Sequence, residues 1–319
     1  MSEPLLQVYN LKKYFEVPQG YLHAVDDVSF TIDKGETLGI VGESGCGKTT
    51  LGRVVLRLLD STDGKVIFDG EDVTRVKGTK LARLRNRMKI IFQDPYSSLD
   101  PRMTVAQTIS EAMIIDGKLS RSDIQKRVFE LMDTVGLARR FVNTYPHELD
   151  GGRRQRIGVA RALSIEPEFI VCDEPVSALD VSIQAQILNL LIDIQAEMGI
   201  AYIFITHDLS VVRYISNNII VMYLGQVVEK VASAELFSNQ IHPYTKALLN
   251  AVPIPVVNYN KERILLKGEI SSPVNPKPGC RFAPRCEYAQ ERCTAEEPEF
   301  REILPEHMVK CHFAEQFVK

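Results

Sequence analysis

The chain has 319 residues, of which 45% are hydrophobic, and it carries a net charge of −3 with a pI near 6.1. This length and composition allow two domains, or one domain with an extension, and exclude disorder throughout. The acidic balance argues against a dominant nucleic-acid surface. The chain opens with an acidic segment and has no apolar run of about 18 residues, so we expect no signal peptide, no spanning helix and a cytoplasmic location.

The first segments predict strands. Residues 5–9 are strand-like, and in residues 24–32 apolar and polar residues alternate with the period of a half-buried strand. Between them we expect a polar loop that carries the aromatic residues Tyr14, Phe15 and Tyr21. Aromatic residues in such a loop cover the edge of a core, or one of them stacks on a nucleobase.

Residues 42–49 read Gly-Glu-Ser-Gly-Cys-Gly-Lys-Thr, the G-x-x-x-x-G-K-[ST] pattern of a phosphate-binding loop. The apolar run 36–41 before it predicts a buried strand, and residues 50–59 after it predict a helix. Backbone N–H groups and the helix N-terminus favour phosphate here, Lys48 is expected to reach the β- and γ-phosphates, and Thr49 is expected to ligate Mg²⁺. The predicted nucleotide contacts are Gly42, Glu43, Ser44, Gly45, Cys46, Gly47, Lys48, Thr49 and Thr50.

The next part of the chain is mainly helical. Residues 66–68 predict one strand of a hairpin, residues 80–87 a basic helix, and residues 88–92 a strand that ends where Pro95 follows. Helical periodicity then continues from about 104 to 163. We therefore predict a helical subdomain, at about residues 94–165, inserted into a sheet domain.

Asp173 and Glu174 follow four apolar residues. A strand that leaves the core and ends in two carboxylates is the expected Mg²⁺-binding and water-activating edge. Residues 183–198 then predict a helix with one apolar face, and residues 201–206 predict a buried strand that ends at His207. Alternation of strand and helix predicts an α/β fold with a mostly parallel sheet, which a hairpin-like segment at 223–229 closes.

The character of the chain changes near residue 235, so we predict one domain over residues 1–235 and an extension over 236–319. A helix at 244–251 precedes a loop-rich tail that begins with Pro253 and Pro255. Four of the six cysteines fall in the last 40 residues, at Cys280, Cys286, Cys293 and Cys311. In a reducing compartment they point to a metal or cluster site rather than to disulfides.

The spacing of these cysteines, C-x5-C-x6-C-x17-C, lacks the C-x2-C pairs of many zinc sites. Four thiolates can hold a [4Fe–4S] cluster. Zinc and free thiols remain the alternatives. Cys46 and Cys172 lie apart from this set, in the phosphate loop and in a buried strand, and need no chemical role.

Six features in one order resemble the ATP-binding subunits of ABC transporters over residues 5 to about 230: an aromatic loop, the phosphate loop, Gln93, Gly151-Gly152 at a helix start, Asp173-Glu174 and His207. The His242-Pro243-Tyr244 segment and the four-cysteine tail are similar to the ATPases of bacterial oligopeptide and dipeptide importers. The resemblance implies a P-loop NTPase fold of ABC type with a mostly parallel sheet core, an antiparallel β subdomain, the inserted helical subdomain and a loop-rich extension. It also implies a [4Fe–4S] cluster on the four cysteines.

The resemblance further implies a catalytic role for four residues. Gln93 touches Mg²⁺ and the attacking water, and Asp173 holds Mg²⁺ through water. Glu174 is the general base for attack on the γ-phosphate, and His207 contacts that phosphate and orients the water.

Other implied contacts involve the base and a second ATPase chain. Phe15, or else Tyr14, stacks on adenine, and Asp180 reaches the partner chain. The glycine-rich signature of each chain, here around Gly151 and Gly152, completes the site of the other.

The signature departs from the usual L-S-G-G-Q, because Asp150 replaces the serine. An ionised carboxylate cannot donate a hydrogen bond to phosphate and repels it. At about 4 Å and an effective dielectric near 20, like charges cost on the order of 4 kcal/mol, which Arg153 and Arg154 could partly offset. We expect an asymmetric pair in which the site that uses Asp150 is weak, with tolerance of Asp150 as the alternative.

The resemblance implies a heterodimer with a second homologous ATPase subunit, two transmembrane permease subunits and an extracytoplasmic solute-binding protein, at the cytoplasmic face of the membrane. Peptides are the expected solute, and nickel, sugar or opine importers remain open because this subunit does not touch the solute. A nucleic-acid-associated ABC ATPase and an exporter ATPase are the rival classes. The single phosphate loop, the acidic balance and the importer-like tail argue against them, and no nucleic-acid partner is expected.

Overall fold

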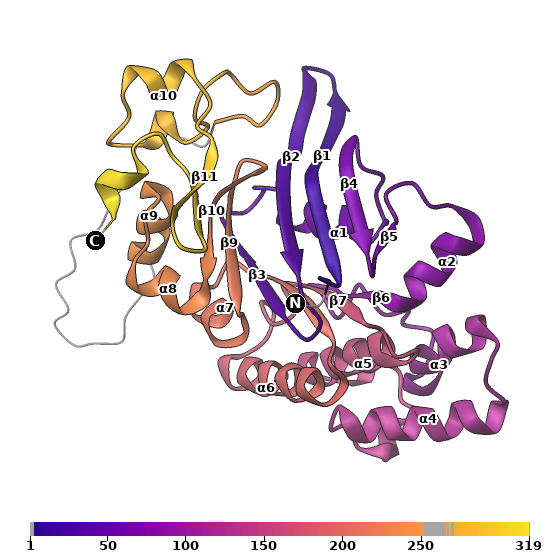
Figure 1. Ribbon diagram of the computed structural model, residues 1–319. Coiled ribbons are helices and arrows are strands. Elements are labelled where there is room, and N and C mark those ends of the chain that lie inside the picture. The colour runs from indigo at the N-terminus through magenta and orange to yellow at the C-terminus, as the bar shows by residue number, and fades with distance from the viewer. Residues whose placement is uncertain (1–2, 252–265, 267, 269–270, 319) are drawn as a thin grey trace, which may run out of the picture. The chain divides into compact units, whose positions relative to one another are not determined.

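The computed structural model describes residues 3–251, 266, 268 and 271–318, which form two compact units (Figure 1). The first unit comprises Met1–Ile32, Thr37–Arg75 and Thr206–Lys319, and the second comprises Asp33–Glu36 and Val76–Ile205. The N-terminal strands, the phosphate loop and the C-terminal extension therefore belong to one unit. The predicted proline-rich start of the tail, at Pro253 and Pro255, lies outside the described residues.

An antiparallel sheet in the first unit has the strand order β2-β1-β4-β5 (Figure 1). Its strands are β1 (Leu6–Val17), β2 (Gly20–Ile32), β4 (Asp63–Phe68) and β5 (Glu71–Asp72). The polar aromatic loop predicted between residues 9 and 24 is wrong, because β1 and β2 extend almost to a common turn. Tyr14 pairs with His23 and Phe15 with Leu22, so the strand ladder satisfies backbone groups that a loop would leave to solvent.

A second group of strands in the first unit has the order β11-β12-β10-β9-β3. These strands are β3 (Thr37–Val41), β9 (Asn218–Tyr223), β10 (Gln226–Ala232), β11 (Phe300–Leu304) and β12 (His307–Lys310). β3 runs parallel to β9, and the other pairs are antiparallel. The predicted closing hairpin is confirmed as β9–β10. The predicted loop-rich tail also contains the β11–β12 hairpin, which joins this sheet because β12 pairs with β10.

Helices of the first unit are short. They are α1 (Lys48–Val55), α7 (Leu209–Ile215), α8 (Ser233–Ser238), α9 (Pro243–Ala251), α10 (Glu291–Ala295) and the 3-10 turns η3 (Ala283–Arg285) and η4 (Ala314–Phe317). The helix predicted to reach residue 59 ends at Val55. Arg57 adopts a left-handed φ of 55°, and the N–H groups of Leu58 and Leu59 return to the carbonyl of Arg53, which closes the helix early.

The second unit contains the parallel strands β6 (Met88–Ile91), β7 (Phe169–Asp173) and β8 (Ala201–Ile205), in the order β8-β7-β6. Its helices are α2 (Gly78–Arg87), α3 (Val105–Asp116), α4 (Arg121–Thr134), α5 (Gly151–Leu163) and α6 (Val181–Met198), with 3-10 turns η1 (Arg139–Phe141) and η2 (Pro146–Glu148). Every residue of β7 and β8 is buried, as parallel strands require. The predicted helical character of the stretch from 104 to 163 is confirmed.

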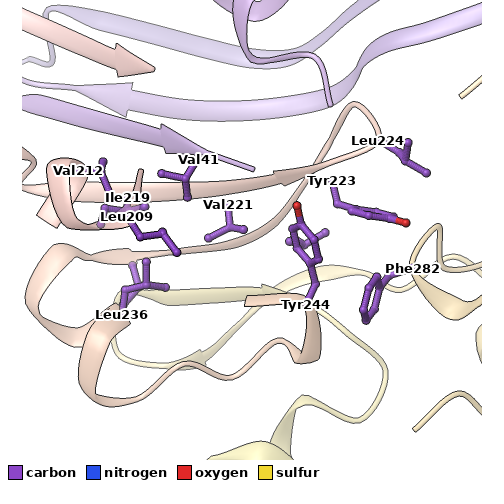
Figure 2. Close-up of a cluster of buried hydrophobic side chains, with 12 residues drawn as sticks. Val41, Leu209, Val212, Ile219, Val221, Tyr223, Leu224, Leu236, Tyr244 and Phe282 are labelled. Atoms are coloured by element: carbon purple, nitrogen blue, oxygen red, sulfur yellow. The ribbon is translucent and has the colours of Figure 1, made fainter. Parts of the chain in front are cut away.

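One apolar cluster of the first unit joins the sheet to the C-terminal extension (Figure 2). Val41 of β3 and Val221 of β9 pack with Val212 of α7, and the cluster continues to Tyr244 of α9 and to Phe282. Burial of this surface fastens the extension to the strand that leads into the phosphate loop. Within the part of the chain that the structure describes, no helix has the length and apolarity that a bilayer crossing requires.

Candidate nucleotide site

The phosphate loop connects β3 to α1, as predicted. Its first and third glycines lie against neighbouring backbone: a Cβ on Gly42 would lie 2.2 Å from the carbonyl oxygen of Met222, and a Cβ on Gly47 would lie 2.0 Å from that of Ala24. Gly47 also has a φ of 105° as it caps α1. Only glycine fits at these two positions, because any side chain would collide with the backbone of neighbouring segments.

Lys48 is 5% exposed and lies within this loop. Its ammonium donates hydrogen bonds to the carbonyl oxygens of Gly42, at 2.8 Å, and Glu43, at 3.0 Å. The ammonium also lies 3.9 Å from the sulfur of Cys46. A buried ammonium with only neutral groups of the loop recorded as its hydrogen-bond partners is suited to meet phosphate oxygens. Thr49 and Thr50 begin α1 beside it and are half-buried.

Cys46 is buried in the loop, and burial raises the pKa of its thiol. The same is true of Cys172 within β7. Both thiols are therefore protonated at neutral pH.

Tyr14 is engaged within its own sheet. Its ring stacks on His23 with centroids 3.9 Å apart, and its hydroxyl donates to the Asp26 carboxylate. Burial would raise the pKa of Asp26, but hydrogen bonds from Tyr14 and His23 and the charge of Arg281 outweigh it and lower that pKa. Phe15 is half-buried, with the Lys13 ammonium 4.9 Å from its ring centroid.

The two carboxylates of the second unit end β7 as predicted. Asp173 is 3% exposed at the end of the strand, and Glu174 leaves the strand with a left-handed φ of 48°. The amide of Gln93 donates to the Glu174 carboxylate at 3.1 Å. Two predicted catalytic residues, 81 positions apart in the chain, are therefore brought together.

Asp150 caps the N-terminus of α5. Its carboxylate accepts from the backbone N–H of Arg153 at 2.8 Å and from the Arg153 guanidinium at 2.7 Å. Arg154 donates instead to the carbonyl of Pro146 at 2.7 Å. Of the two arginines expected to offset the charge of Asp150, only Arg153 contacts it, because Arg154 points back along the chain.

The remaining predicted residues lie at helix starts. Gly151 and Gly152 open α5, where a Cβ on Gly152 would lie 2.8 Å from a methyl group of Ile183. Asp180 precedes α6 and is exposed. His207 is exposed before α7, which Asp208 caps. Lys48, Thr49 and His207 thus belong to the first unit, and Gln93, Asp173, Glu174, Asp150 and Asp180 to the second.

The four cysteines of the tail gather in one region. The N–H of Cys280 donates to the carbonyl of Cys293 at 2.7 Å. Burial, with a contribution from other cysteines of the set, raises the pKa of the Cys280 and Cys311 thiols to about 11 and also raises that of Cys286. However, no three His, Cys, Asp or Glu side chains among the described residues are placed to hold a metal ion. The predicted [4Fe–4S] site is therefore not supported by this arrangement of side chains.

Two residues that no sequence prediction assigned to the site contact the phosphate loop. Arg285 pairs with the carboxylate of Glu43, and the hydroxyl of Tyr244 accepts from the Glu43 N–H. Tyr244 stands in the His-Pro-Tyr segment that carried the resemblance. The one sequence feature that marks Arg285 is its position directly before Cys286. That position does not predict a contact with Glu43, 242 residues away.

Comparison with known proteins places the chain in a family. The ABC transporter family matches residues 25–177, and the family described as oligopeptide/dipeptide transporter, C-terminal region, matches residues 228–293. The oligopeptide transport ATP-binding protein AppF of Bacillus subtilis (strain 168) is 48% identical over 321 residues, 98% of each chain. OppF of the same strain, named likewise, is 50% identical over 318 residues, 99% of this chain and 98% of its own.

Among solved structures, the ATP-binding cassette MJ0796, in a dimeric post-hydrolysis state bound to ADP and Pi, is similar with a TM-score of 0.65. It is 30% identical in sequence, and the match covers 72% of this chain and 98% of that one. This match supports the ABC-type P-loop fold that the sequence predicted.

Proposed function

The chain belongs to the ATP-binding subunits of ABC transporters, in the group with an oligopeptide/dipeptide transporter C-terminal region, and we propose that its ATP hydrolysis powers peptide import through a membrane permease. The observation that carries this proposal is the complete phosphate loop, with the Lys48 ammonium held inside it, in a chain that matches oligopeptide transport ATP-binding proteins over nearly its full length.

The proposed mechanism positions charge around the γ-phosphate. Lys48 and the N–H groups at the start of α1 bind the phosphate oxygens, while Thr49 and Gln93 would hold Mg²⁺ directly and Asp173 would hold it through water. When bound, Mg²⁺ neutralises charge on the β- and γ-phosphates. The structure fits this role because Lys48 is buried within the loop and because a side chain at Gly42 or Gly47 would collide with neighbouring backbone.

Glu174 is the proposed general base. It accepts a proton from the water whose oxygen bonds to the γ-phosphorus, while the bond from that phosphorus to the ADP oxygen breaks. Gln93, hydrogen-bonded to Glu174 at 3.1 Å, holds the carboxylate and the water in one orientation. His207 is proposed to contact the γ-phosphate and orient the water. Products are ADP and phosphate.

Replacement of the base separates binding from chemistry. Glu174→Gln is expected to bind ATP with wild-type affinity and to lower turnover by about 100-fold or more, since the amide cannot accept the proton. Lys48→Ala is expected to lose ATP affinity as well. Equal turnover of both variants and wild type in the assembled complex, with the partner's own site silenced, would refute the proposal.

We propose Phe15 as the adenine-stacking residue, because Tyr14 already stacks on His23 and bonds to Asp26. Phe15→Ala should weaken the binding of ATP several-fold and the binding of GTP by a smaller factor, since stacking on a base contributes about 1 to 3 kcal/mol. Tyr14→Phe, which keeps the ring, is the matched variant. A larger loss with Tyr14→Ala than with Phe15→Ala would reverse the assignment.

A second ATPase chain is proposed to complete each site, with Asp180 and the α5 N-terminus facing the partner. The site that uses Asp150 is proposed to be the weaker of the two. The pairing of Asp150 with Arg153 lowers the net negative charge there, but it leaves no hydroxyl donor for phosphate. Asp150→Ser in the assembled transporter is expected to raise turnover at that site. Unchanged affinity and turnover at both sites would end the idea of asymmetry.

The remaining partners follow from the proposed transport role: two permease subunits, an extracytoplasmic solute-binding protein, and a place at the cytoplasmic face of the membrane. Purification of the tagged chain from membranes should recover the permeases and the second ATPase. The ligand held by the solute-binding protein then identifies the solute and distinguishes peptides from nickel, sugars or opines. Recovery of RNA in place of permeases would favour the rival class.

A [4Fe–4S] cluster on Cys280, Cys286, Cys293 and Cys311 is also proposed, on the strength of the resemblance of the four-cysteine tail to importer ATPases and not of the side-chain arrangement. Anaerobically purified protein should then contain iron and acid-labile sulfide and absorb in the visible range. Colourless protein free of iron would refute it, and bound zinc would point to the alternative metal.

A further inference from the structure

We propose that Tyr244 and Arg285 are positioning residues of the phosphate loop, so that the C-terminal extension forms a working part of the ATP site. Both residues meet Glu43, the second residue of the loop. The inference rests on the ATP-dependent function proposed above and goes beyond it, because it assigns residues outside the nucleotide-binding motifs to nucleotide binding.

Glu43 is held through its side chain, its N–H and its carbonyl. The Arg285 guanidinium forms a two-pronged pair with its carboxylate, at 2.8 and 3.2 Å. The Tyr244 hydroxyl accepts from its backbone N–H at 2.9 Å, and the Lys48 ammonium donates to its carbonyl at 3.0 Å. The extension therefore fixes the loop on one side while the phosphate-binding lysine is bonded to the same residue.

The two holding side chains both pack against aromatic rings, and Figure 2 shows the rings around Tyr244. Tyr244 is fully buried, with its ring centroid 4.7 Å from Tyr223 and 5.4 Å from Phe282. The Arg285 guanidinium lies over the Tyr223 ring at 5.9 Å, and its side chain is 9% exposed. Rigid support of this kind is what precise placement of a binding loop requires.

Charge explains why the loop needs this support. Glu43 puts a carboxylate into a loop that receives a triphosphate, and like charges repel. The forked guanidinium of Arg285 neutralises that carboxylate, in the two-pronged geometry in which arginine binds carboxylates most strongly. Loss of Arg285 would leave the Glu43 charge unpaired beside bound phosphate, so ATP affinity should fall.

The same extension also contacts the β1–β2 hairpin, which carries the proposed adenine-stacking residue. Pro273 accepts from the N–H of His23 at 3.0 Å. The Asn275 side chain accepts from the N–H of Tyr21 and donates to the carbonyl of Gln19, both at 2.9 Å. The extension thus reaches the phosphate loop and the proposed base-binding strand together, as expected of a positioning element.

Affinity of the full-length chain for Mg·ATP tests the proposal. Arg285→Ala is expected to weaken binding about tenfold, and Tyr244→Phe, which removes a single hydrogen bond and keeps the ring, about threefold. Arg292→Ala is the matched control. Arg292 also directly precedes a cysteine, Cys293, but it is 60% exposed and its guanidinium pairs with Glu296, the residue that follows α10, so ATP affinity should not change.

Two readouts separate positioning from simple destabilisation. In the assembled transporter the KM for ATP should rise while kcat stays near wild type. Glu43→Gln combined with Arg285→Ala should bind ATP no worse than Arg285→Ala alone, because the unpaired carboxylate is gone. Arg285→Lys should recover part of the affinity.

Binding within twofold of wild type for both Arg285→Ala and Tyr244→Phe would overturn the proposal, as would an equal loss in Arg292→Ala. If Arg285→Ala fails to fold, Tyr244→Phe decides alone. Lys48→Ala, measured alongside, tests the ATPase function independently. Normal ATPase activity of Lys48→Ala would refute the proposed function. Loss of activity in Lys48→Ala together with normal ATP affinity in Arg285→Ala would refute only the positioning role.

Discussion

At the scale of single residues, the nucleotide site depends on atoms that are absent as much as on atoms that are present. Gly42 and Gly47 leave room for the carbonyl groups of Met222 and Ala24, which lie so close that a Cβ at either glycine would clash with them. Lys48 then fills the interior of the loop with its ammonium. The motif predicted both features, but only the packing shows which neighbouring strands demand the glycines.

Gly47→Ala tests this reading. The added methyl group would lie 2.0 Å from a backbone oxygen, at a φ of 105° that side chains rarely adopt, so the loop must shift. We expect ATP affinity to fall by about tenfold or more. Gly158→Ala is the control, because a Cβ there meets nothing within 4 Å in the middle of α5. Wild-type ATP binding by Gly47→Ala would contradict the assigned role of this contact.

His242 makes stability depend on pH. Burial lowers the pKa of its imidazole to about 4, from an ordinary 6.5, and its Nδ1 accepts from the N–H of Tyr244 at 3.1 Å. Between these pH values the unfolded chain binds a proton that the folded chain refuses, so stability falls as the pH drops. The full effect is about 3 kcal/mol.

Thermal unfolding of wild type and His242→Asn between pH 7 and pH 4 measures this effect. Asparagine can accept the same hydrogen bond but does not titrate. The midpoint of the variant should therefore fall less steeply as the pH is lowered. Parallel curves for the two proteins would show that His242 does not contribute.

At the scale of elements, the C-terminal hairpin is fastened by one buried carboxylate. Glu229 of β10 is fully buried and accepts from His307 of β12 at 2.7 Å, and from the N–H groups of Ile241 and His242 at 2.7 and 3.1 Å. Three donors from two segments thus converge on one side chain. The carboxylate joins β12 and the start of α9 to β10.

Glu229→Ala is expected to destabilise the first unit by about 3 kcal/mol or more, because three buried donors lose their acceptor. The loss should appear as a lower thermal midpoint and faster amide exchange in β11 and β12. Glu296→Ala is the comparison, since its pair with Arg292 is mostly exposed and should contribute less than about 1 kcal/mol. Similar midpoints for the two variants would argue against the role of Glu229.

Elements were predictable where burial is uniform. β7 and β8 are buried throughout and apolar except for Asp173 at the end of β7, so their sequence predicts them as strands. The stretch around Tyr14 and Phe15 does not show the alternation of apolar and polar residues that predicts a strand, because Lys12, Lys13 and Glu16 interrupt it. Pairing with β2 decides that it is a strand, and such pairing is invisible in local composition.

At the scale of the whole molecule, bound ATP should stabilise the chain by mass action. Ligand at 100 times its dissociation constant adds about 2.7 kcal/mol to the folded state. The thermal midpoint of the full-length protein should therefore rise with Mg·ATP concentration, and Lys48→Ala should abolish the rise. A rise of equal size in Lys48→Ala would place ATP elsewhere.

Sequence alone determined the phosphate loop, the paired acids at the end of β7 and the family, because each depends on residue types at fixed spacing along the chain. Only the tertiary structure decided that Glu43 is held by Arg285 and Tyr244, and that β12 joins β10. These contacts link residues that lie up to 242 positions apart, so no local pattern records them. Packing of the extension against the strands of its own unit creates them.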